Sequence, residues 1–478
     1  MNNITDFILN ENNNQTIFEK PIFENNDFHS QKYLYIPNTL PGFVNTKSEF
    51  SNDTEICYLF GFIPSTRPNC PHCNHKMHIK DNQTTTLTHL AFGRTKTRIV
   101  ADRTRYECPL CGTIHTSELP FKDKHHFITD TLKTHVEELL QLNITLKTIA
   151  KMTGLHQATI KAIDKERLLN LHVDSATGRL KKPETYSKYI GIDEFKLHNG
   201  YKFATHIVDL MTGHILWIQE GKKKNVVYDF IDHVGQEWMS HVVAVACDMN
   251  SDYKEAFCDK CPHIKTVFDY FHIVKNFNEK VISAIRKDEH ARLIAEGREI
   301  EAKDLKKTKY ILCSKLETLR KKDLQGEEGQ IIKHSSTIFS TTEAVRSKTD
   351  RQEIYHKLIQ ENELLFICDI IKARLEKAYE ARNQGIMEME IDEIISICQE
   401  SHNRHLIWFG KFLKRHIDGI ISHASYSIST GKIEGINNKI KTLRRQGYGY
   451  PDDEYFFLKI IDASTHKYTR NPKSPFRG

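Results

Sequence analysis

Two acidic residues follow short apolar stretches with the composition of buried β-strands. VVAVACDMN leads to Asp248, and SKYIGIDEF leads to Asp193. Each aspartate alone could be a strand cap or a turn residue. If the two strands end side by side in one sheet, the carboxylates are neighbours, and two buried like charges are costly unless cations neutralise them. Carboxylates with open coordination positions bind Mg²⁺ and phosphate oxygens, so the pair predicts two-metal phosphoryl-transfer chemistry.

A third acidic residue lies in a strongly basic stretch. In STGKIEGINNKIKTLRRQGYGY, Glu434 is near the start of a predicted helix whose other face carries Lys439, Lys441, Arg444 and Arg445. These cations suit DNA phosphates, and a glutamate among them suits a metal site on which that DNA would lie. The alternative is a glutamate that the helix dipole favours in the first turn, and the local sequence leaves both interpretations open.

Four cysteines form two CxxC pairs, each with proline after the first cysteine. They are Cys70 and Cys73 in CPHC, and Cys108 and Cys111 in CPLC. Two such turns supply four thiolates, which predicts a closed tetrahedral zinc site in a zinc ribbon, whereas unmetallated core cysteines are the alternative. A closed site leaves no position for catalysis, so one structural Zn²⁺ is expected. The single pair in CDKC, at 258–261, has no matching partner pair and is interpreted as coincidental.

The stretch NITLKTIAKMTGLHQATIKAID has the pattern of two short helices that cross at a tight turn. Ile149 lies on the inner face of the first helix, Gly154 is at the turn, and Ile160 and Ile163 return at helical spacing. This predicts a helix-turn-helix whose second helix runs over about 157–168, with an ordinary helical hairpin as the alternative. The residues that we expect to face DNA in this helix and in the ribbon are Gln157, Thr159, Lys161, Lys165, Arg94, Lys96 and Arg98.

Length and composition fit a multidomain protein that binds a polyanion. The chain has 478 residues, a formal net charge of +6 and 11 cysteines, an odd number that cannot all form disulfides. Basic clusters such as RTKTR, KIKTLRR and the tail HKYTRNPKSPFRG suit a polyanion, although any one of them could be solvated surface. No stretch approaches the ~20 apolar residues of a membrane span, and no signal-peptide pattern is found. A cytoplasmic protein without a membrane partner is therefore expected.

The order of patterns along the chain is small β-structure, helices, α/β and long helices. The predicted division is a mobile N-terminal segment at 1–31, a zinc ribbon at 32–125, a helix-turn-helix domain at 126–182, an α/β segment at 183–280, long helices at 281–428, and a final helix with a basic tail at 429–478.

Several motifs, in this order, resemble the transposases of the ISL-three family of bacterial insertion sequences. They are CPHC with CPLC, the helix-turn-helix, YIGIDEF, VACDMN, FDYFHIVKNFNE and EGINNKIKTLRRQGYGY. The resemblance implies an RNase H-like core with a DDE-type acidic triad of Asp193, Asp248 and Glu434, interrupted by a helical insertion. The segments 183–280 and 429–478 would then form one catalytic core, and 281–428 would be the helical insertion. The resemblance also implies two Mg²⁺ or Mn²⁺ ions at the triad.

The FDYFH motif adds two further residues that match the family, Asp269 and His272. Their role is not fixed by the resemblance: His272 could orient a leaving group or water, or form a hydrogen bond within the core. The asparagine-rich N-terminus and the CDKC pair depart from the family pattern, and neither affects the triad.

The function that the resemblance implies is DNA transposition. The protein would bind the terminal inverted repeats through its N-terminal modules and catalyse metal-dependent phosphodiester hydrolysis and transesterification into target DNA. Because two ends must meet, a homodimer or larger assembly is expected, in the bacterial cytoplasm and on the nucleoid when bound. An RNase H-like nuclease that does not join DNA, and a DNA-binding regulator with an inactive core, are the alternatives. A glycosidase is excluded because the carboxylates lie among basic residues rather than sugar-stacking aromatics.

Overall fold

A computed structural model describes residues 40–465, except 65, 143, 199–201, 250, 329–330, 333–343, 346–348, 427, 429–430 and 448–449. The predicted mobile segment at 1–31 and the basic tail after 465 lie outside these residues. The chain forms two compact units, Met1–Val136 and Glu137–Gly478, called here the N-terminal and C-terminal units. No helix among the described residues combines the length and apolar composition needed to cross a bilayer.

The N-terminal unit is built on a five-stranded sheet of order β1-β2-β4-β3, with β5 paired to β4. Its strands are β1 (Val44–Ser51), β2 (Ile56–Phe62), β3 (His78–Phe92), β4 (Thr95–Glu107) and β5 (Ile114–Thr116). The long β3–β4 hairpin is antiparallel and pairs His78 with Glu107 at its far end. Alternate residues of these strands, among them Leu59, Leu87 and Ile99, form a small buried core. The sheet therefore brings the segments just before β3 and just after β4 together.

Three helices lead from the N-terminal sheet into the C-terminal unit. They are α1 (Asp130–Gln141), α2 (Leu146–Thr153) and α3 (Gln157–His172). Gly154 ends α2 at a φ of 72°, a left-handed conformation that glycine adopts without strain, and its N–H binds the carbonyl of Ala150. Ile149, Ile160 and Ile163 are fully buried, as the predicted tight crossing requires. The second helix extends four residues beyond the predicted end at 168.

The C-terminal unit contains a second five-stranded sheet, of order β10-β9-β6-β7-β8. Its strands are β6 (Tyr189–Lys196), β7 (Phe203–Asp209), β8 (Ile215–Glu220), β9 (Ala244–Cys247) and β10 (Lys265–Phe268). The first three form the predicted antiparallel meander, whereas β9 is parallel to both β6 and β10. This unit is thus mixed α/β, with the parallel strands rich in the apolar residues that burial on both faces demands.

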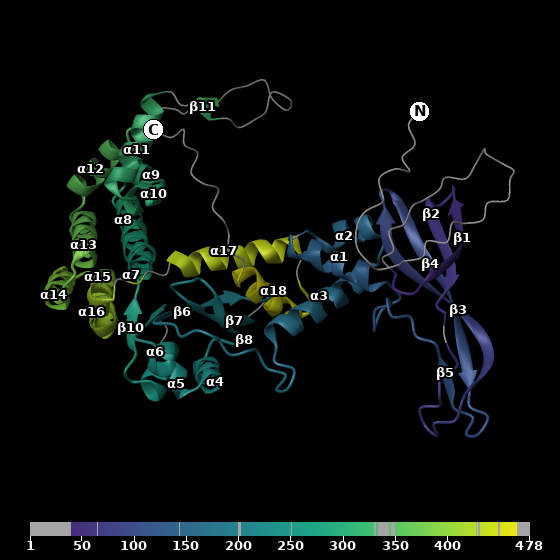
Figure 1. Cartoon of the computed structure of the whole chain (residues 1–478). Coiled ribbons are helices and arrows are strands. Elements are labelled where there is room, and N and C mark those ends of the chain that lie inside the picture. Colours follow the sequence, from purple (N-terminus) through teal and green to yellow (C-terminus); the bar gives the residue numbers. More distant parts are fainter. Residues whose placement is uncertain are drawn as a thin grey trace, which may run out of the picture. The chain divides into compact units, whose positions relative to one another are not determined.

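Helices cover both faces of this sheet (Figure 1). On one face lie α4 (Lys224–Val234), α5 (Gln236–Ser240) and α6 (Ser251–Lys260), which share a core with Ile190, Ile192 and Val245. On the other lie α17 (Gly431–Gln446) and α18 (Asp453–Thr465), which pack on Phe195 and Val208. Each strand therefore alternates between two apolar environments, and a side chain's position in the strand decides which helices it meets.

A long run of helices separates β10 from α17. It comprises α7 (Tyr270–Asn276), a π-helix (Phe277–Ile282), α8 (Ser283–Ala295), α9 (Glu299–Lys306), α10 (Lys309–Cys313), α11 (Leu316–Glu327), the short strands β11 (Ile331–Ile332) and β12 (Ala344–Val345), α12 (Arg351–Glu361), α13 (Glu363–Glu380), α14 (Gln384–Glu400), α15 (Arg404–Arg415) and α16 (Ile417–Ser425). Asn362, Asn383 and Asn403 cap α13, α14 and α15 by accepting hydrogen bonds from backbone N–H groups of their first turns.

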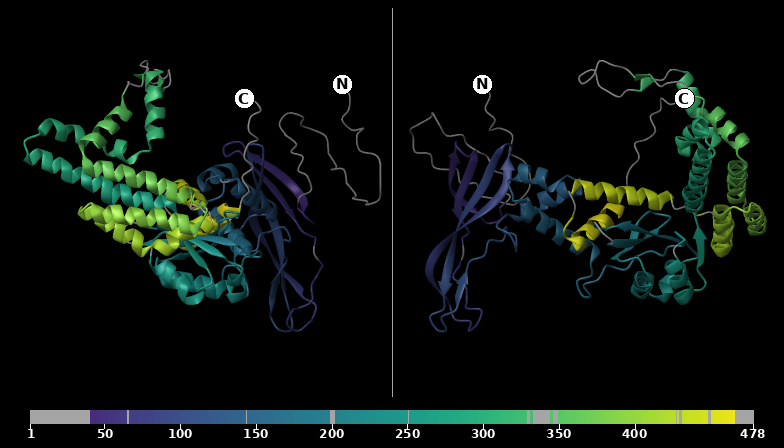
Figure 2. Two further views of the ribbon diagram at one scale, coloured as in Figure 1. Left: turned by 90° about the vertical axis from the view of Figure 1, so that its left-hand side faces the viewer. Right: turned by 180° about the vertical axis from the view of Figure 1, so that it is seen from behind.

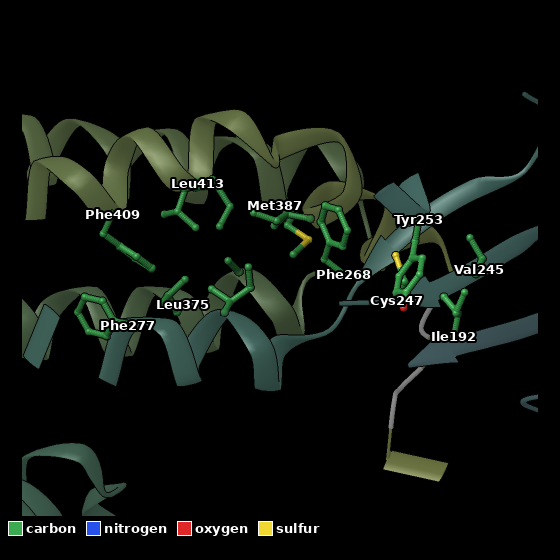
Figure 3. Packing of buried hydrophobic residues seen from close by; sticks show 14 of the residues in the cluster. Ile192, Val245, Cys247, Tyr253, Phe268, Phe277, Leu375, Met387, Phe409 and Leu413 are labelled. Carbon is green, nitrogen blue, oxygen red and sulfur yellow. The ribbon is translucent and has the colours of Figure 1, made fainter. Parts of the chain in front are cut away.

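These helices share one continuous apolar core with the sheet. Helices α13, α14 and α15 lie side by side (Figure 2). Leu375 and Met387 of this bundle belong to the same buried cluster as Ile192 and Phe268 of the sheet (Figure 3). At the junction, a Cβ on Gly419 of α16 would lie 2.4 Å from the ring of Phe268, so only glycine allows this approach. The helical run is thus part of the structural core of the C-terminal unit.

A buried polar network joins α3 to α18. Arg167 donates hydrogen bonds to Asp164 over 2.9 Å and to Asp462 over 3.0 Å. Lys459 and the hydroxyl of Tyr455 also donate to Asp164, over 3.0 and 2.6 Å. Burial alone would raise the pKa of Asp462, but the bonds from His172 and Arg167 overcome it and hold that pKa well below its usual range. Asp462 is therefore a buried carboxylate whose charge is balanced by the guanidinium of Arg167.

Replacement of Arg167 should strongly destabilise the C-terminal unit. Arg167→Met leaves two aspartates buried without this cation, and breaking such a buried pair costs about 3–5 kcal/mol. The 3 tryptophans, Trp217, Trp238 and Trp408, all lie in the C-terminal unit, so their fluorescence during urea unfolding reports on it. Arg404→Met is the control, because the Arg404 side chain is 75% exposed in its pair with Asp288 and should contribute under about 1 kcal/mol. Equal shifts in the two variants would contradict the prediction.

Candidate active site and zinc centre

Parallel pairing of β6 and β9 brings Asp193 and Asp248 together. The last aligned pair is Ile192 with Cys247, and the two aspartates follow directly. Gly191 and Ala246, two residues earlier, lie on the face that α17 covers. Because residues two apart in a strand share a face, both carboxylates belong to this face. The predicted strands are thus neighbours, but β6 continues to Lys196, so the expectation that Asp193 ends its strand is wrong.

The Asp193 carboxylate is held at both oxygens. The backbone N–H of Glu194 donates to Oδ1 over 2.8 Å, and the side-chain amide of Asn437 donates to Oδ2 over 2.7 Å. Burial raises the pKa of Asp193 above its ordinary value, and the negative charge of Asp248 adds to this, whereas the two hydrogen bonds oppose it. A cation at the site would favour the charged carboxylate.

The protein itself supplies little positive charge to this pair. Within the described part of the chain, neither Asp193 nor Asp248 forms an ion pair with a lysine or arginine; His272 Nδ1 lies 3.7 Å from Asp248 Oδ1. His206 is the cross-strand neighbour of Asp193, and burial lowers its pKa to about 4, so its ring is neutral at pH 7. Two hard oxygen ligands without an internal cation fit Mg²⁺ or Mn²⁺.

The FDYFH motif lies at the start of α7, beside this pair. Asp269 is buried and caps the helix by accepting a hydrogen bond from the N–H of Phe271 over 3.1 Å. This bond gives Asp269 a structural role. His272 is in the first turn of α7, and its distance from Asp248 suits an ion pair but is too long for a hydrogen bond. A catalytic role for either residue stays a prediction.

Glu434 lies on α17, the helix that contacts Asp193. The preceding residue, Ile433, packs against Gly191, where a Cβ would lie only 2.5 Å from Ile433 Cδ1, so glycine is needed for the helix to approach the strand. Asn437, which binds Asp193, is one helical turn after Glu434. Glu434 itself is exposed, and its carboxylate forms no hydrogen bond or ion pair with another described residue. Its place in a triad stays a prediction.

The four cations of α17 do not share one free face, contrary to expectation. Lys439 donates to the carbonyl of Ala463 in the last turn of α18, and Arg444 donates to the carbonyl of Lys196 over 2.7 Å. These two side chains therefore hold α17 to its neighbours. Lys441 and Arg445 are exposed, and they follow Glu434 by seven and eleven residues, which places all three on one side of the helix. Contact with DNA stays a prediction for all four.

Two of the four residues predicted to face DNA on α3 point elsewhere. Lys161 pairs with Asp452 over 3.0 Å, and Lys165 pairs with Asp452 over 3.3 Å and with Glu454 over 2.6 Å. The expectation that these lysines point outward is corrected, because acidic residues at the start of α18 attract them. Gln157 is exposed and Thr159 is half-buried.

The predicted basic residues of the N-terminal unit lie at the tip of the β3–β4 hairpin. Arg94 and Lys96 are exposed, whereas Arg98 is half-buried and donates to the hydroxyl of Thr88. The first two are therefore free to meet a polyanion, and the third partly serves the sheet. Contact of these three residues with DNA stays a prediction.

The four predicted zinc ligands converge in the N-terminal unit. One sulfur from each of Cys70, Cys73, Cys108 and Cys111 lies within 4.8 Å of the others, and the closest pair, Cys73 with Cys108, is 3.4 Å apart. Four thiolates at Zn–S distances of ~2.3 Å would have sulfurs roughly 3.8 Å apart. The donor set and its spacing thus fit one structural Zn²⁺.

The two cysteine turns have the same backbone design. The residue after each second cysteine, Asn74 and Gly112, has a positive φ of 57° and 70°, and its N–H binds the carbonyl of the first cysteine of its turn over 2.8 and 2.9 Å. The hydroxyl of Thr113 helps lower the pKa of Cys111 to about 6, which favours the thiolate that binds zinc. Pairing of β3 with β4 brings the two turns together.

Sequence reasoning missed two groups beside the acidic pair. Asn437 could have been found from its position three residues after Glu434 on one helix. The hydroxyl of Tyr253 donates to Glu194 over 3.0 Å and contacts the hydroxyl of Thr205 at 2.9 Å, on the opposite face of β6. No sequence signal connects these three residues, because the contacts depend on how α6 packs on the sheet.

Loss of one cysteine ligand should remove the zinc. Purified protein is expected to contain about one Zn²⁺ per chain by elemental analysis, and Cys108→Ser should lose it and expose the β3–β4 region to proteolysis. Cys258→Ser is the matched control, since Cys258 is exposed and lies outside the four-cysteine group. Zinc that is retained in Cys108→Ser, or lost equally in the control, would contradict this assignment.

Comparison with known proteins agrees with these features. The family model of the ISL-three DDE transposases, described as transposase, matches residues 190–460, more than half of the chain. The transposase for insertion sequence element IS1001 of Bordetella parapertussis is 27% identical over 365 residues, covering 76% of this chain and 80% of that relative. The transposase for IS1557 of Mycobacterium tuberculosis is 24% identical over 300 residues, covering 59% of this chain and 61% of the relative. The chain therefore belongs to the ISL-three family of transposases.

Proposed function

We propose that this transposase binds the inverted-repeat ends of its insertion sequence and catalyses metal-dependent cleavage and strand transfer of DNA. The observation that carries the proposal is the acidic pair: Asp193 and Asp248 follow aligned positions of neighbouring parallel strands, share one face, and have no lysine or arginine partner among the described residues. Family membership supports the same reaction class.

The proposed core is RNase H-like. Its support is the sheet order, in which an antiparallel meander of β6, β7 and β8 is extended by the parallel strands β9 and β10. In this proposal the helices from 281 to 428 are an insertion between the second and third acidic residues. Asp193, Asp248 and Glu434 form the DDE triad, and α17 presents Glu434 from the side on which both aspartates lie.

Two Mg²⁺ or Mn²⁺ ions bound by these carboxylates would stabilise the attacking and leaving oxygens of the phosphodiester. Each oxygen of Asp193 accepts one hydrogen bond from the protein and keeps a second lone pair, so either oxygen could bind a cation. Asp248 is more exposed, with 41% of its side chain accessible, and Glu434 faces solvent on the adjacent helix. These positions leave room for a DNA strand against the carboxylates.

DNA would be held by cations that the fold leaves free. Lys441 and Arg445 extend from Glu434 along α17, and Arg94 and Lys96 are exposed on the proposed zinc ribbon. Gln157, a neutral side chain that can hydrogen-bond to base edges, is exposed on the proposed helix-turn-helix. These modules would recognise the double-stranded inverted repeats, and the metal centre would act on both element and target DNA. Because two ends are joined, we propose a homodimer or larger assembly, acting in the bacterial cytoplasm on nucleoid DNA.

Asp248→Asn should abolish DNA cleavage and strand transfer while DNA binding remains. The substitution removes one anionic metal ligand, so the variant should neither nick nor join labelled element ends in Mg²⁺. The wild-type protein in EDTA should likewise give no cleavage and no strand-transfer product. Asp259→Asn is the control, because Asp259 lies on α6 and pairs with Tyr228 and Lys224 away from the site. Cleavage by Asp248→Asn at the wild-type rate would overturn the triad.

The same assay separates the two alternatives. A nuclease that does not join would release cut ends but no strand-transfer product with wild type in Mg²⁺. A DNA-binding regulator with an inactive core would bind the ends and leave them intact. The acidic pair has no lysine or arginine partner among the described residues, which disfavours the regulator, since a protein without metal chemistry gains nothing from two neighbouring carboxylates.

Lys441→Ala should weaken DNA binding in a salt-dependent way. Loss of one phosphate contact should reduce the slope of log K against log salt concentration by about 1 and weaken specific and non-specific DNA alike. Lys377→Ala serves as control, since Lys377 is 67% exposed and pairs with Glu390 in the helical insertion. An unchanged slope in Lys441→Ala, measured by fluorescence anisotropy across a salt series, would remove Lys441 from the DNA contacts.

A further inference from the structure

Asn437 connects the helix of Glu434 to the strand of Asp193. Its Nδ2 donates to Asp193 Oδ2 over 2.7 Å, across 244 residues of sequence. Its Oδ1 is buried and has no hydrogen-bond partner among the described residues. The opposite amide orientation would place this oxygen against the carboxylate and lose the bond, so the nitrogen must face Asp193. The hydrogen bond to Asp193 thus leaves the Asn437 carbonyl oxygen buried without a hydrogen-bond partner among the described residues.

The bond fixes how the Asp193 carboxylate is turned. The Glu194 N–H binds one oxygen and Asn437 binds the other, so rotation of the carboxylate would break at least one hydrogen bond. One lone pair on each oxygen stays available. Because the carboxylate is already fixed in the folded protein, cation binding to its two oxygens does not have to order it.

The same bond fixes α17. Ile433 packs on Gly191 of β6, and Asn437 binds Asp193 two residues further along that strand. Two contacts one turn apart, on one side of the helix, determine both its rotation and its position along the strand. Glu434 lies between them in sequence, so its direction depends on both.

We propose that Asn437 is a positioning residue of the acidic site: its amide orients Asp193 and locks α17 so that Glu434 is directed toward the same cations. This inference rests on the proposed metal-dependent function. In this role Asn437 acts through Asp193 and Glu434. Mutation of the partners that orient metal ligands typically lowers metal affinity by about 10–100-fold.

The test is Mn²⁺ binding to the full chain without DNA, measured from the free-ion signal in electron paramagnetic resonance. Asn437→Leu keeps the approximate shape of the side chain but has no donor, and should weaken Mn²⁺ binding about 10-fold or more. Asn437→Gln keeps an amide donor on a longer side chain and should recover part of the affinity. Asn438→Ala, at the exposed neighbouring position of α17, should bind Mn²⁺ as wild type does.

Two comparisons make the result decisive. Tryptophan fluorescence and the urea midpoint should be alike in wild type, Asn437→Gln and Asn438→Ala, which separates lost positioning from lost folding. If Asp193→Asn loses Mn²⁺ while both Asn437 variants bind it as wild type does, the positioning role is overturned and the metal site stands. If Asp193→Asn also binds Mn²⁺ as wild type does, the proposed metal site itself fails.

Discussion

Parallel pairing between β6 and β9 is the constraint on which the acidic site depends. The two strands are far apart in sequence, and only their register decides whether Asp193 and Asp248 meet. A shift of one residue would turn one carboxylate into the apolar core beneath α4–α6, where an unpaired charge is very costly. The apolar alternation of Ile190, Ile192, Val245 and Cys247 excludes that shift. The core that stabilises the sheet therefore also aligns the carboxylates.

The remaining elements of the site are attached to this sheet by close contacts at small residues. Gly191 admits Ile433 of α17, and Gly419 admits Phe268 at the junction with the helical run. Because one apolar cluster extends from the sheet through α13–α15, the long segment between β10 and α17 returns the chain to the sheet at a defined place. The helices thus help determine where α17 begins, and through it where Glu434 lies.

The sequence contained enough to predict the cysteine cluster, the meander, the helix pair around Gly154 and the neighbouring strands of the two aspartates. These features depend on local spacing and on apolar alternation, which a single chain displays directly. The roles of basic side chains were less accessible. Lys161, Lys165, Lys439 and Arg444 look like free cations, but each binds an acid or a carbonyl of this chain. The partners of Lys161, Lys165 and Arg444 lie hundreds of residues away and leave no local pattern. The position of Asn437 one turn after Glu434 is visible in the sequence, but its contact with Asp193, across 244 residues, is not.

The ionic network between α3 and α18 fixes the position of α3 relative to the sheet that carries the acidic pair. Asp164, Arg167 and Asp462 are buried and mutually dependent, so α3 cannot tilt away from α18 without exposing unpaired charges. If α3 reads the element's end, as proposed, the separation between the base pairs that it reads and the carboxylates that cut is a fixed length. The cut would then lie a fixed number of base pairs from the recognition sequence. Inserting one base pair between the recognition sequence and the element's tip would therefore shift the cut by one base pair relative to the tip.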